Sequence, residues 1–257
     1  DILFVIDDSG SMGQEQSNLA TNFPLFVDVL NGFTSSAGTP IDYHLGVTTT
    51  SVSKDWTIGG ILPGDQDGDD GKLINNGCTV PRKWLERDDA QLSETFSCVA
   101  QATGGANDEM PLEALRLAVT DRVSDGANAG FFRDDALLAV VVLTDENDCS
   151  RSDNNFQLGL GDDLCDDLEP VTSYLTALDQ FKGERGRWAS AFIAGTGPGD
   201  CNSDFGSAEE ASRLLDFASQ AGGNAITSSI CEGDLASALG EALAAFEEAC
   251  MSFPPID

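Results

Sequence analysis

Short apolar runs alternate along the chain with segments in which apolar residues recur every three to four positions. Five runs have the length and composition of strands, at residues 2–7, 43–50, 136–145, 188–195 and 224–228. Strands that alternate with amphipathic helices are typical of a parallel sheet with crossover helices. The first and third runs are apolar throughout, as expected for strands covered on both faces. The pattern therefore predicts an α/β fold.

Helical periodicity is clearest near the C-terminus. There, one apolar stripe is predicted from residues at three- to four-residue intervals: Leu235, Leu239, Leu243, Phe246 and Cys250.

In two other predicted helices, a proline or a capping pattern predicts where the helix is interrupted or begins. The first predicted helix, over residues 14–33, contains Pro24, so it is expected to kink or to begin again there. Ser207 followed by Glu210 has the spacing of a capping box, which predicts the start of a helix through Leu214.

The length of 257 residues suits one large domain, and we predict that residues 1–257 form one. Two acidic stretches, residues 56–103 and 146–170, are predicted to be insertions into it. A helix is expected at about residues 84–99 within the first insertion.

The net charge of the chain limits the classes of partner that it can bind. Asp and Glu total 44 against 13 Lys and Arg, a formal net charge of -31. Such a surface repels phosphates, so nucleic acid and anionic membranes are poor partners, whereas cations are attracted. For most of these carboxylates, solubility or adaptation to a salty medium is an open alternative. No apolar run reaches the ~18 residues of a membrane span, so membrane insertion by this segment is not expected.

The cysteines indicate the compartment. None of the seven forms a C-x-x-C pair and His44 is the single histidine, which argues against zinc and against a thioredoxin-like site. Disulfides in an oxidising compartment are the better account, with buried free thiols as the alternative. Cys149 and Cys165 are predicted to staple their loop, and the odd count leaves one thiol free or paired elsewhere. Since the chain begins inside a strand pattern without a signal peptide, we expect it to be part of a longer chain.

Oxygen-bearing side chains follow the first predicted strand directly. Asp7, Ser9 and Ser11 stand at alternate positions there, and open α/β sheets bind ligands at the carboxyl ends of their strands. Carboxylate and hydroxyl oxygens are hard donors that suit Mg²⁺, Ca²⁺ or Mn²⁺. The alternative is that Asp8, Ser9 and Ser11 only cap the helix that follows.

Two further junctions offer similar donors. Thr144 and Asp145 end the third apolar run, and the glycine-rich stretch TGGANDEMPLEAL precedes another predicted helix. Three junctions that supply oxygen ligands favour a metal site over capping alone.

The motifs FVIDDSGSMG, TGGANDEMPLEALRLAV and VVVLTDEND, in this order, resemble the von Willebrand factor A domain with its metal-ion-dependent adhesion site. With its cysteine-bearing insertions, the chain is most similar to secreted bacterial members. The resemblance covers essentially the whole chain. It implies a doubly wound, mostly parallel central sheet in the order 3-2-1-4-5-6, with one antiparallel edge strand and helices on both faces. It also implies that Asp7, Ser9 and Ser11 coordinate the metal, with Asp145 contributing directly or through water.

One departure from the family concerns the middle loop. The family offers a threonine hydroxyl after the paired glycines, whereas Ala106, Asn107, Asp108 and Glu109 stand here. We predict that Glu109 replaces the threonine, with Asp108 as second choice. An extra carboxylate would supply negative charge internally, which predicts weaker ligand binding or a preference for calcium. Alternatively, Glu109 is an ordinary acidic residue in the first turn of a helix.

Other candidate sites have weaker patterns. Asp65, Asp67 and Asp69 alternate as in the opening of a calcium loop, but they depart from the EF-hand pattern, and a solvated acidic loop is the alternative. His44 lies in an apolar strand pattern and is predicted to be packed or hydrogen-bonded rather than a catalytic base. Because the chain has no nucleophile elbow, phosphate loop or dinucleotide fingerprint, we do not expect an enzyme.

Together these features predict a ligand-binding domain that is extracellular, on the cell surface or periplasmic. Its Mg²⁺, Ca²⁺ or Mn²⁺ would accept a carboxylate from a protein or glycan partner. Two alternatives stay open: a structural or assembly module of a larger cell-surface protein, in which the metal only stabilises the fold, and a chelatase-like regulatory subunit.

Overall fold

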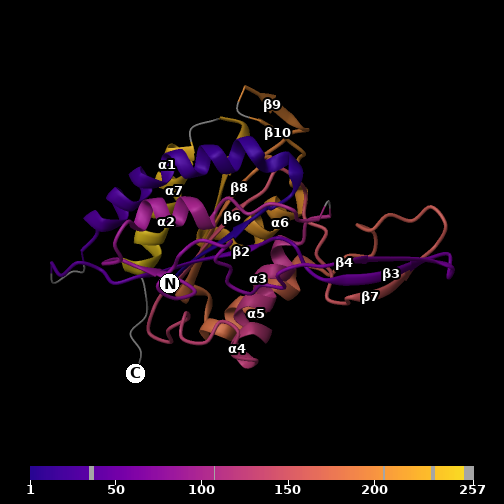
Figure 1. Cartoon of the computed structure of the whole chain (residues 1–257), viewed down its shortest axis with the longest axis horizontal. Helices are drawn as coiled ribbons and strands as arrows, with labels where there is room; N and C mark the ends of the chain where they lie inside the picture. The colour runs from indigo at the N-terminus through magenta and orange to yellow at the C-terminus, as the bar shows by residue number, and fades with distance from the viewer. Residues whose placement is uncertain (35–37, 107, 205, 233–234, 252–257) are drawn as a thin grey trace.

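A computed structural model describes residues 1–34, 38–106, 108–204, 206–232 and 235–251. Within them, a six-stranded central sheet has the order β11-β8-β6-β1-β2-β5 (Figure 1). Its strands are β1 (Ile2–Ile6), β2 (His44–Thr49), β5 (Leu85–Glu86), β6 (Leu138–Leu143), β8 (Trp188–Ala194) and β11 (Ala225–Ser229). All neighbouring pairs are parallel except β2 and β5. The predicted mixed α/β fold with a mostly parallel sheet is therefore confirmed.

The five apolar runs that the sequence predicts as strands all lie in this sheet. The pattern of apolar residues did not predict the position of the short antiparallel edge strand β5. It lies within residues 56–103, so part of that stretch belongs to the central sheet.

Side chains that alternate along the strands enter two separate cores. On one face, Phe4 and Val141 pack among residues of α1, α2 and α7. On the other face, Val5 and Val142 pack among residues of α3, α5 and α6. The helices are α1 (Gly13–Gly32), α2 (Leu92–Val99), α3 (Pro111–Val119), α4 (Asp121–Ser124), α5 (Val171–Lys182), α6 (Ser212–Ala221) and α7 (Leu235–Met251).

Several helix predictions can be compared with these bounds. Helix α1 runs through Pro24 as one element, so of the two predicted alternatives the restart is wrong, and the kink stays a prediction. In α7 the predicted apolar stripe is buried, except that Cys250 is exposed. The helix predicted over residues 84–99 begins only at Leu92.

The predicted capping box is wrong. Ser207 lies in strand β10 (Gly206–Ala208), which pairs with β9 (Cys201–Ser203) in a hairpin, and α6 begins only at Ser212. Glu210 instead accepts a hydrogen bond from the backbone amide of Gly199, with 2.6 Å between Oε2 and N.

The two predicted insertions meet in a second, three-stranded sheet of order β4-β3-β7. Its strands are β3 (Lys54–Ile58), β4 (Leu62–Gln66) and β7 (Asn155–Leu158). Figure 1 shows this small sheet extending away from the central sheet, at the right. Segments about a hundred positions apart in the chain thus lie side by side. That they are insertions into one domain stays a prediction.

Three disulfides occur among the described residues: Cys78–Cys98, Cys149–Cys165 and Cys201–Cys231. The predicted staple between Cys149 and Cys165 is confirmed, and Cys250 is the free thiol. Three disulfides are compatible with an extracellular protein. In the part of the chain that the structure describes, no helix is both long and apolar enough to cross a bilayer.

Candidate metal centre

Asp7 lies at the carboxyl end of β1, where its backbone amide donates to the carbonyl of Leu143 at the end of β6, 2.9 Å away. The Asp7 side chain is fully buried. One carboxylate oxygen accepts from the amide of Ser9 at 2.8 Å, and the other accepts from the hydroxyl of Thr144 at 2.7 Å. These bonds orient the Asp7 carboxylate between the loops that follow the two central strands.

The other predicted ligands lie beside it. The hydroxyl oxygens of Ser9 and Ser11 are 2.8 Å apart, and Ser11 Oγ donates to Asp145 Oδ1 at 3.2 Å. Asp7, Ser9, Ser11 and Asp145 therefore form one connected set of contacts. Neither serine caps a helix: the first helical turn, Gly10–Met12, has Ser9 at its N-cap without a side-chain capping bond. The capping alternative is thus not supported.

Glu109 approaches from the loop before α3 and is completely buried. Its Oε2 accepts a hydrogen bond from the hydroxyl of Thr50, while its Oε1 has no hydrogen-bond partner among the described residues. Asp108 is partly exposed and pairs with Lys54, with 3.7 Å between Oδ2 and Nζ. This contrast favours Glu109 over Asp108 as the residue directed to the centre. Asn107, in the same loop, lies outside the described residues.

The carboxyl groups of this region share one electrostatic environment. Burial raises the pKa of Asp145 to about 7, and repulsion from Asp7 adds to the effect. Burial and then the charge of Asp7 raise the pKa of Glu109 to about 9 and that of Glu146 to about 7. The pKa of Asp7 is itself raised by burial. Each group therefore resists carrying its charge in the absence of a cation.

No described Lys or Arg forms an ion pair with these carboxylates. Lys54 interacts electrostatically with Glu109, but its ion pair is with Asp108. Buried charge without a partner is costly, and a divalent ion would offset it. The donor set of carboxylate and hydroxyl oxygens suits Mg²⁺, Ca²⁺ or Mn²⁺, so the residues present fit such an ion.

Among the described residues, no three His, Cys, Asp or Glu side chains gather closely enough to hold a metal. A metal at this centre therefore depends on the serine hydroxyls as well as on the carboxylates.

The second predicted site, in the acidic loop, can be assessed in the same way. Asp65 lies on β4, and Asp69 accepts a hydrogen bond from Thr49 Oγ1 at 2.8 Å. Asp65, Asp67 and Asp69 thus do not gather into a calcium loop of three carboxylates.

Sequence reasoning missed two residues next to the centre, Glu15 and Gln16. Glu15 is buried in the first turn of α1, and its Oε2 has no hydrogen-bond partner among the described residues. Gln16 Nε2 donates to the carbonyls of Asp7 and Ala102, both at 2.7 Å, and so ties the first loop to the middle loop. The only sequence signal was that both residues follow the first motif closely.

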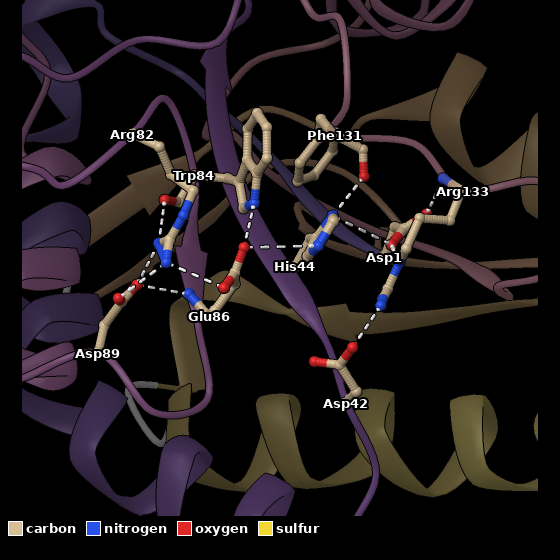
Figure 2. A network of polar contacts seen from close by, with 9 residues as sticks. All are labelled: Asp1, Asp42, His44, Arg82, Trp84, Glu86, Asp89, Phe131 and Arg133. Atoms are coloured by element: carbon tan, nitrogen blue, oxygen red, sulfur yellow. Dashed lines mark hydrogen bonds and ion pairs between the residues drawn. The ribbon is translucent and has the colours of Figure 1, made fainter.

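His44 lies at the amino end of β2, whereas Asp7 follows the carboxyl end of the neighbouring parallel strand β1. Figure 2 shows the polar contacts around His44. Its Nδ1 is 2.7 Å from the carbonyl oxygen of Phe131, and its ring lies against Trp84. Asp1 and Glu86 each place a carboxylate oxygen 3.7 Å from a ring nitrogen. The predicted packed and hydrogen-bonded histidine is confirmed.

No family model matches this chain, and no curated protein matches it.

Proposed function

We propose that the chain is a domain of the von Willebrand factor A type that binds a partner through a divalent cation. The cation would lie at the loops after β1 and β6 and before α3. The observation that carries the proposal is the buried carboxylate of Asp7, which lies among the oxygens of Ser9, Ser11 and Asp145 without a described cationic partner.

The order of the central strands supports the proposed family. When only these strands are counted along the chain, β5, β2, β1, β6, β8 and β11 correspond to 3-2-1-4-5-6. The chain crosses from one side of β1 to the other between β5 and β6, so the loops after β1 and β6 lie at a switch point of the sheet. Ligands of doubly wound sheets bind at such points.

The donor set suggests what the ion would do. Asp7, Ser9 and Ser11 would hold it, with Asp145 beside them, and two of these four donors are neutral hydroxyls. A bound divalent ion would keep spare positive charge and attract a carboxylate from outside. The partner would be a protein or a glycan that presents such a group, since the net charge of -31 disfavours nucleic acid.

Glu109 supports a second candidate function. Its unpartnered Oε1 is buried within the electrostatic reach of Asp7. If this oxygen fills the position that an outside carboxylate needs, the metal only stabilises a structural module of a larger protein. The three disulfides support an extracellular, cell-surface or periplasmic setting for either function.

The relaxation of water protons by bound Mn²⁺ separates these functions. We expect acetate to displace water from Mn²⁺ on the wild type and so to lower the relaxivity of the complex. Asp7→Ala should bind no Mn²⁺ at the centre, whereas the control Asp67→Ala, in an exposed loop, should behave as the wild type. Tight Mn²⁺ binding with a relaxivity that acetate leaves unchanged would favour the structural module.

A further inference from the structure

The small sheet of β3, β4 and β7 ends in an exposed apolar tip, which is formed by Ile61, Leu62 and Leu160. These side chains are 78%, 58% and 81% exposed, respectively. Ile61 and Leu62 lie where β3 turns into β4, and Leu160 lies just after β7. In Figure 1 the turn between β3 and β4 lies at the right-hand end of the small sheet, away from the central sheet.

Backbone and side-chain contacts bring the three side chains to one end of the sheet. Strands β3 and β7 pair in parallel as far as Ile58 and Leu158, and the amide of Gly59 donates to the carbonyl of Leu158 at 2.8 Å. The amide of Ile61 donates to the carbonyl of Ile58 at 3.2 Å and so closes the turn. A methyl group placed on Gly59 would lie 3.0 Å from Leu160 Cδ2. Leu160 therefore lies over the turn that carries Ile61, and the apolar tip is one patch.

Apolar side chains nearer the base of the same sheet are covered. The rings of Trp56 and Phe156 stack, with 6.5 Å between their centroids, and the guanidinium of Arg151 lies 3.4 Å from the centroid of Phe156. Phe156 and Leu158 are each 7% exposed. The apolar tip stays exposed instead, and it belongs to neither of the two described cores. Exposed apolar side chains that are grouped mark interaction sites, whereas single ones need no explanation.

Aspartates without a described cationic partner lie near the tip. Asp55 and Asp65 stand directly opposite each other in β3 and β4 and are both exposed. Like charges at opposite positions of a sheet are unfavourable. Beside the tip, Asp162 Oδ2 accepts from the amide of Gly159, one residue before Leu160, at 2.6 Å. No described Lys or Arg forms an ion pair with any of these three aspartates.

The basic residues of the small sheet are already paired. Lys54, the first residue of β3, is buried and pairs with Asp108, with 3.7 Å between Nζ and Oδ2. Arg151, before β7, is also buried, and its Nε lies 2.7 Å from Asp153 Oδ1. Residues 55–67 and 152–167 contain no Lys or Arg. The charge around the apolar tip is therefore negative, and a partner that supplies cations would complement it.

We infer that the apolar tip docks a protein partner whose surface places apolar side chains beside Lys or Arg. The apolar side chains would cover the tip, and the cations would meet the aspartates at its rim. An apolar centre with a polar rim is the usual anatomy of a protein interface. The aspartates would repel lipid phosphates, and a second copy of the chain would bring the same net charge of -31, so neither complements this surface. The inference does not rest on the proposed function, since none of these residues belongs to the proposed metal set.

Designed peptides serve as probes of this surface. A fluorescent peptide of Leu and Lys that forms an amphipathic helix presents apolar and cationic groups together. In one comparison peptide Ser replaces every Leu, and in another Glu replaces every Lys. Fluorescence anisotropy measures the binding of each peptide to the chain, in Mg²⁺ and in EDTA.

The apolar contribution is tested by the double variant Ile61→Ser with Leu160→Ser. We expect this variant to bind the Leu–Lys peptide about tenfold more weakly than the wild type, which corresponds to ~1.4 kcal/mol. The matched control, Leu25→Ser with Val29→Ser, removes two side chains of α1 that are 55% and 48% exposed. This control should bind as the wild type does. Because all four side chains are exposed, both variants should keep the melting temperature of the wild type.

The charged contribution is tested by Asp55→Asn with Asp65→Asn. This variant should weaken binding of the Leu–Lys peptide by a smaller factor, and added salt should reduce the difference from the wild type. The matched control, Asp28→Asn with Glu247→Gln, removes two charges from exposed positions of α1 and α7. It should bind the peptide as the wild type does.

Several outcomes would overturn the inference. The first is equal affinity of the Leu–Lys peptide for the wild type and for Ile61→Ser with Leu160→Ser. A Ser–Lys peptide that binds as tightly as the Leu–Lys peptide would show attraction by charge alone, and an equally tight Leu–Glu peptide would reject the cationic partner. Phosphatidylcholine vesicles that bind the wild type but not the tip variant would assign the surface to membranes. A wild-type dimer that the tip variant abolishes would assign it to a second copy of the chain.

The metal centre is tested separately from this surface. Binding of the Leu–Lys peptide should be the same in EDTA as in Mg²⁺, and the same for Asp7→Ala as for the wild type. Loss of binding in either case would place the peptide at the metal centre and overturn the inference. A chain that binds no cation but still binds the peptide through its apolar tip would reject the proposed function and support the docking surface.

Discussion

The hydroxyl of Thr144 donates a hydrogen bond to Asp7, which lies 137 residues earlier in the chain, with 2.7 Å between Oγ1 and Oδ2. This bond joins the ends of the two central strands and orients the Asp7 carboxylate. Groups that orient metal ligands typically affect metal affinity by about 10–100-fold.

Thr144→Ala should weaken Mg²⁺ binding by about tenfold, because Asp7 loses the partner that orients it. Thr144→Ser is the matched control and should retain most of the affinity, since it keeps the hydroxyl. Isothermal titration calorimetry measures both. Equal affinity of Thr144→Ala and the wild type would show that Asp7 does not depend on this bond for binding metal.

Glu109→Thr tests the role of the extra buried carboxylate. Removing a buried carboxyl group with an unpartnered oxygen should raise the melting temperature of the metal-free protein. It should also weaken Mg²⁺ binding and strengthen binding of acetate to the bound metal, since the ion keeps more of its charge. Calorimetry and Mn²⁺ relaxivity measure these effects. A metal-free variant less stable than the wild type would contradict this account of Glu109.

The stability of the metal-free chain should depend on pH through Asp145 and Glu146. Burial raises the pKa of each to about 7, from ordinary values of 3.8 and 4.5. A raised carboxyl pKa contributes stability that is fully present below the ordinary value and is lost as the pH rises through the folded value. The free energy of unfolding should therefore fall between about pH 4 and about pH 7.

Urea unfolding in metal-free buffer measures this loss, and Mg²⁺ should reduce it near neutral pH. The double variant Asp145→Asn with Glu146→Gln should show a smaller fall than the wild type over the same range. Parallel curves for the two proteins would mean that other groups control the pH dependence.

The disulfide Cys149–Cys165 should stabilise the metal centre as well as the fold. The amide of Cys149 donates to the carbonyl of Glu109 at 2.8 Å, so the bridge lies next to the middle loop. Replacing both cysteines by serine should lower the free energy of unfolding by roughly 3 kcal/mol, the value for a closed loop of about 15 residues. Cys250→Ser removes an exposed free thiol and should change nothing. Urea unfolding and Mg²⁺ titration of both variants measure these effects. An unchanged Mg²⁺ affinity in the double variant would show that the disulfide does not stabilise the metal centre.

The parts of the fold that local pattern determines were predicted well from the sequence. Strands β1 and β6 are buried on both faces, so their runs are apolar throughout and easy to recognise. Asp7, Ser9 and Ser11 could be proposed as ligands because their spacing is local, and Asp145 because it follows a central strand. The structure brings these four together.

Features that depend on long-range packing could not be predicted. Strand β7 pairs with β3 across about a hundred positions, and its local pattern contains no signal of that partner. Glu15 looked like an ordinary residue of a first helical turn, yet it packs against Gly206 of the β9–β10 hairpin. Ser207 matched a capping box only by spacing, since it belongs to that hairpin.

Thermal unfolding with added cations tests the central claim most directly. The wild type, Asp7→Ala and the control Asp67→Ala are each melted with EDTA and with Mg²⁺, Ca²⁺ or Mn²⁺. At a hundredfold excess over its dissociation constant, a cation that binds only the folded state adds about 2.7 kcal/mol. We predict that at least one cation raises the melting temperature of the wild type and of Asp67→Ala but not that of Asp7→Ala. A wild type that responds to none of the three cations would contradict the account.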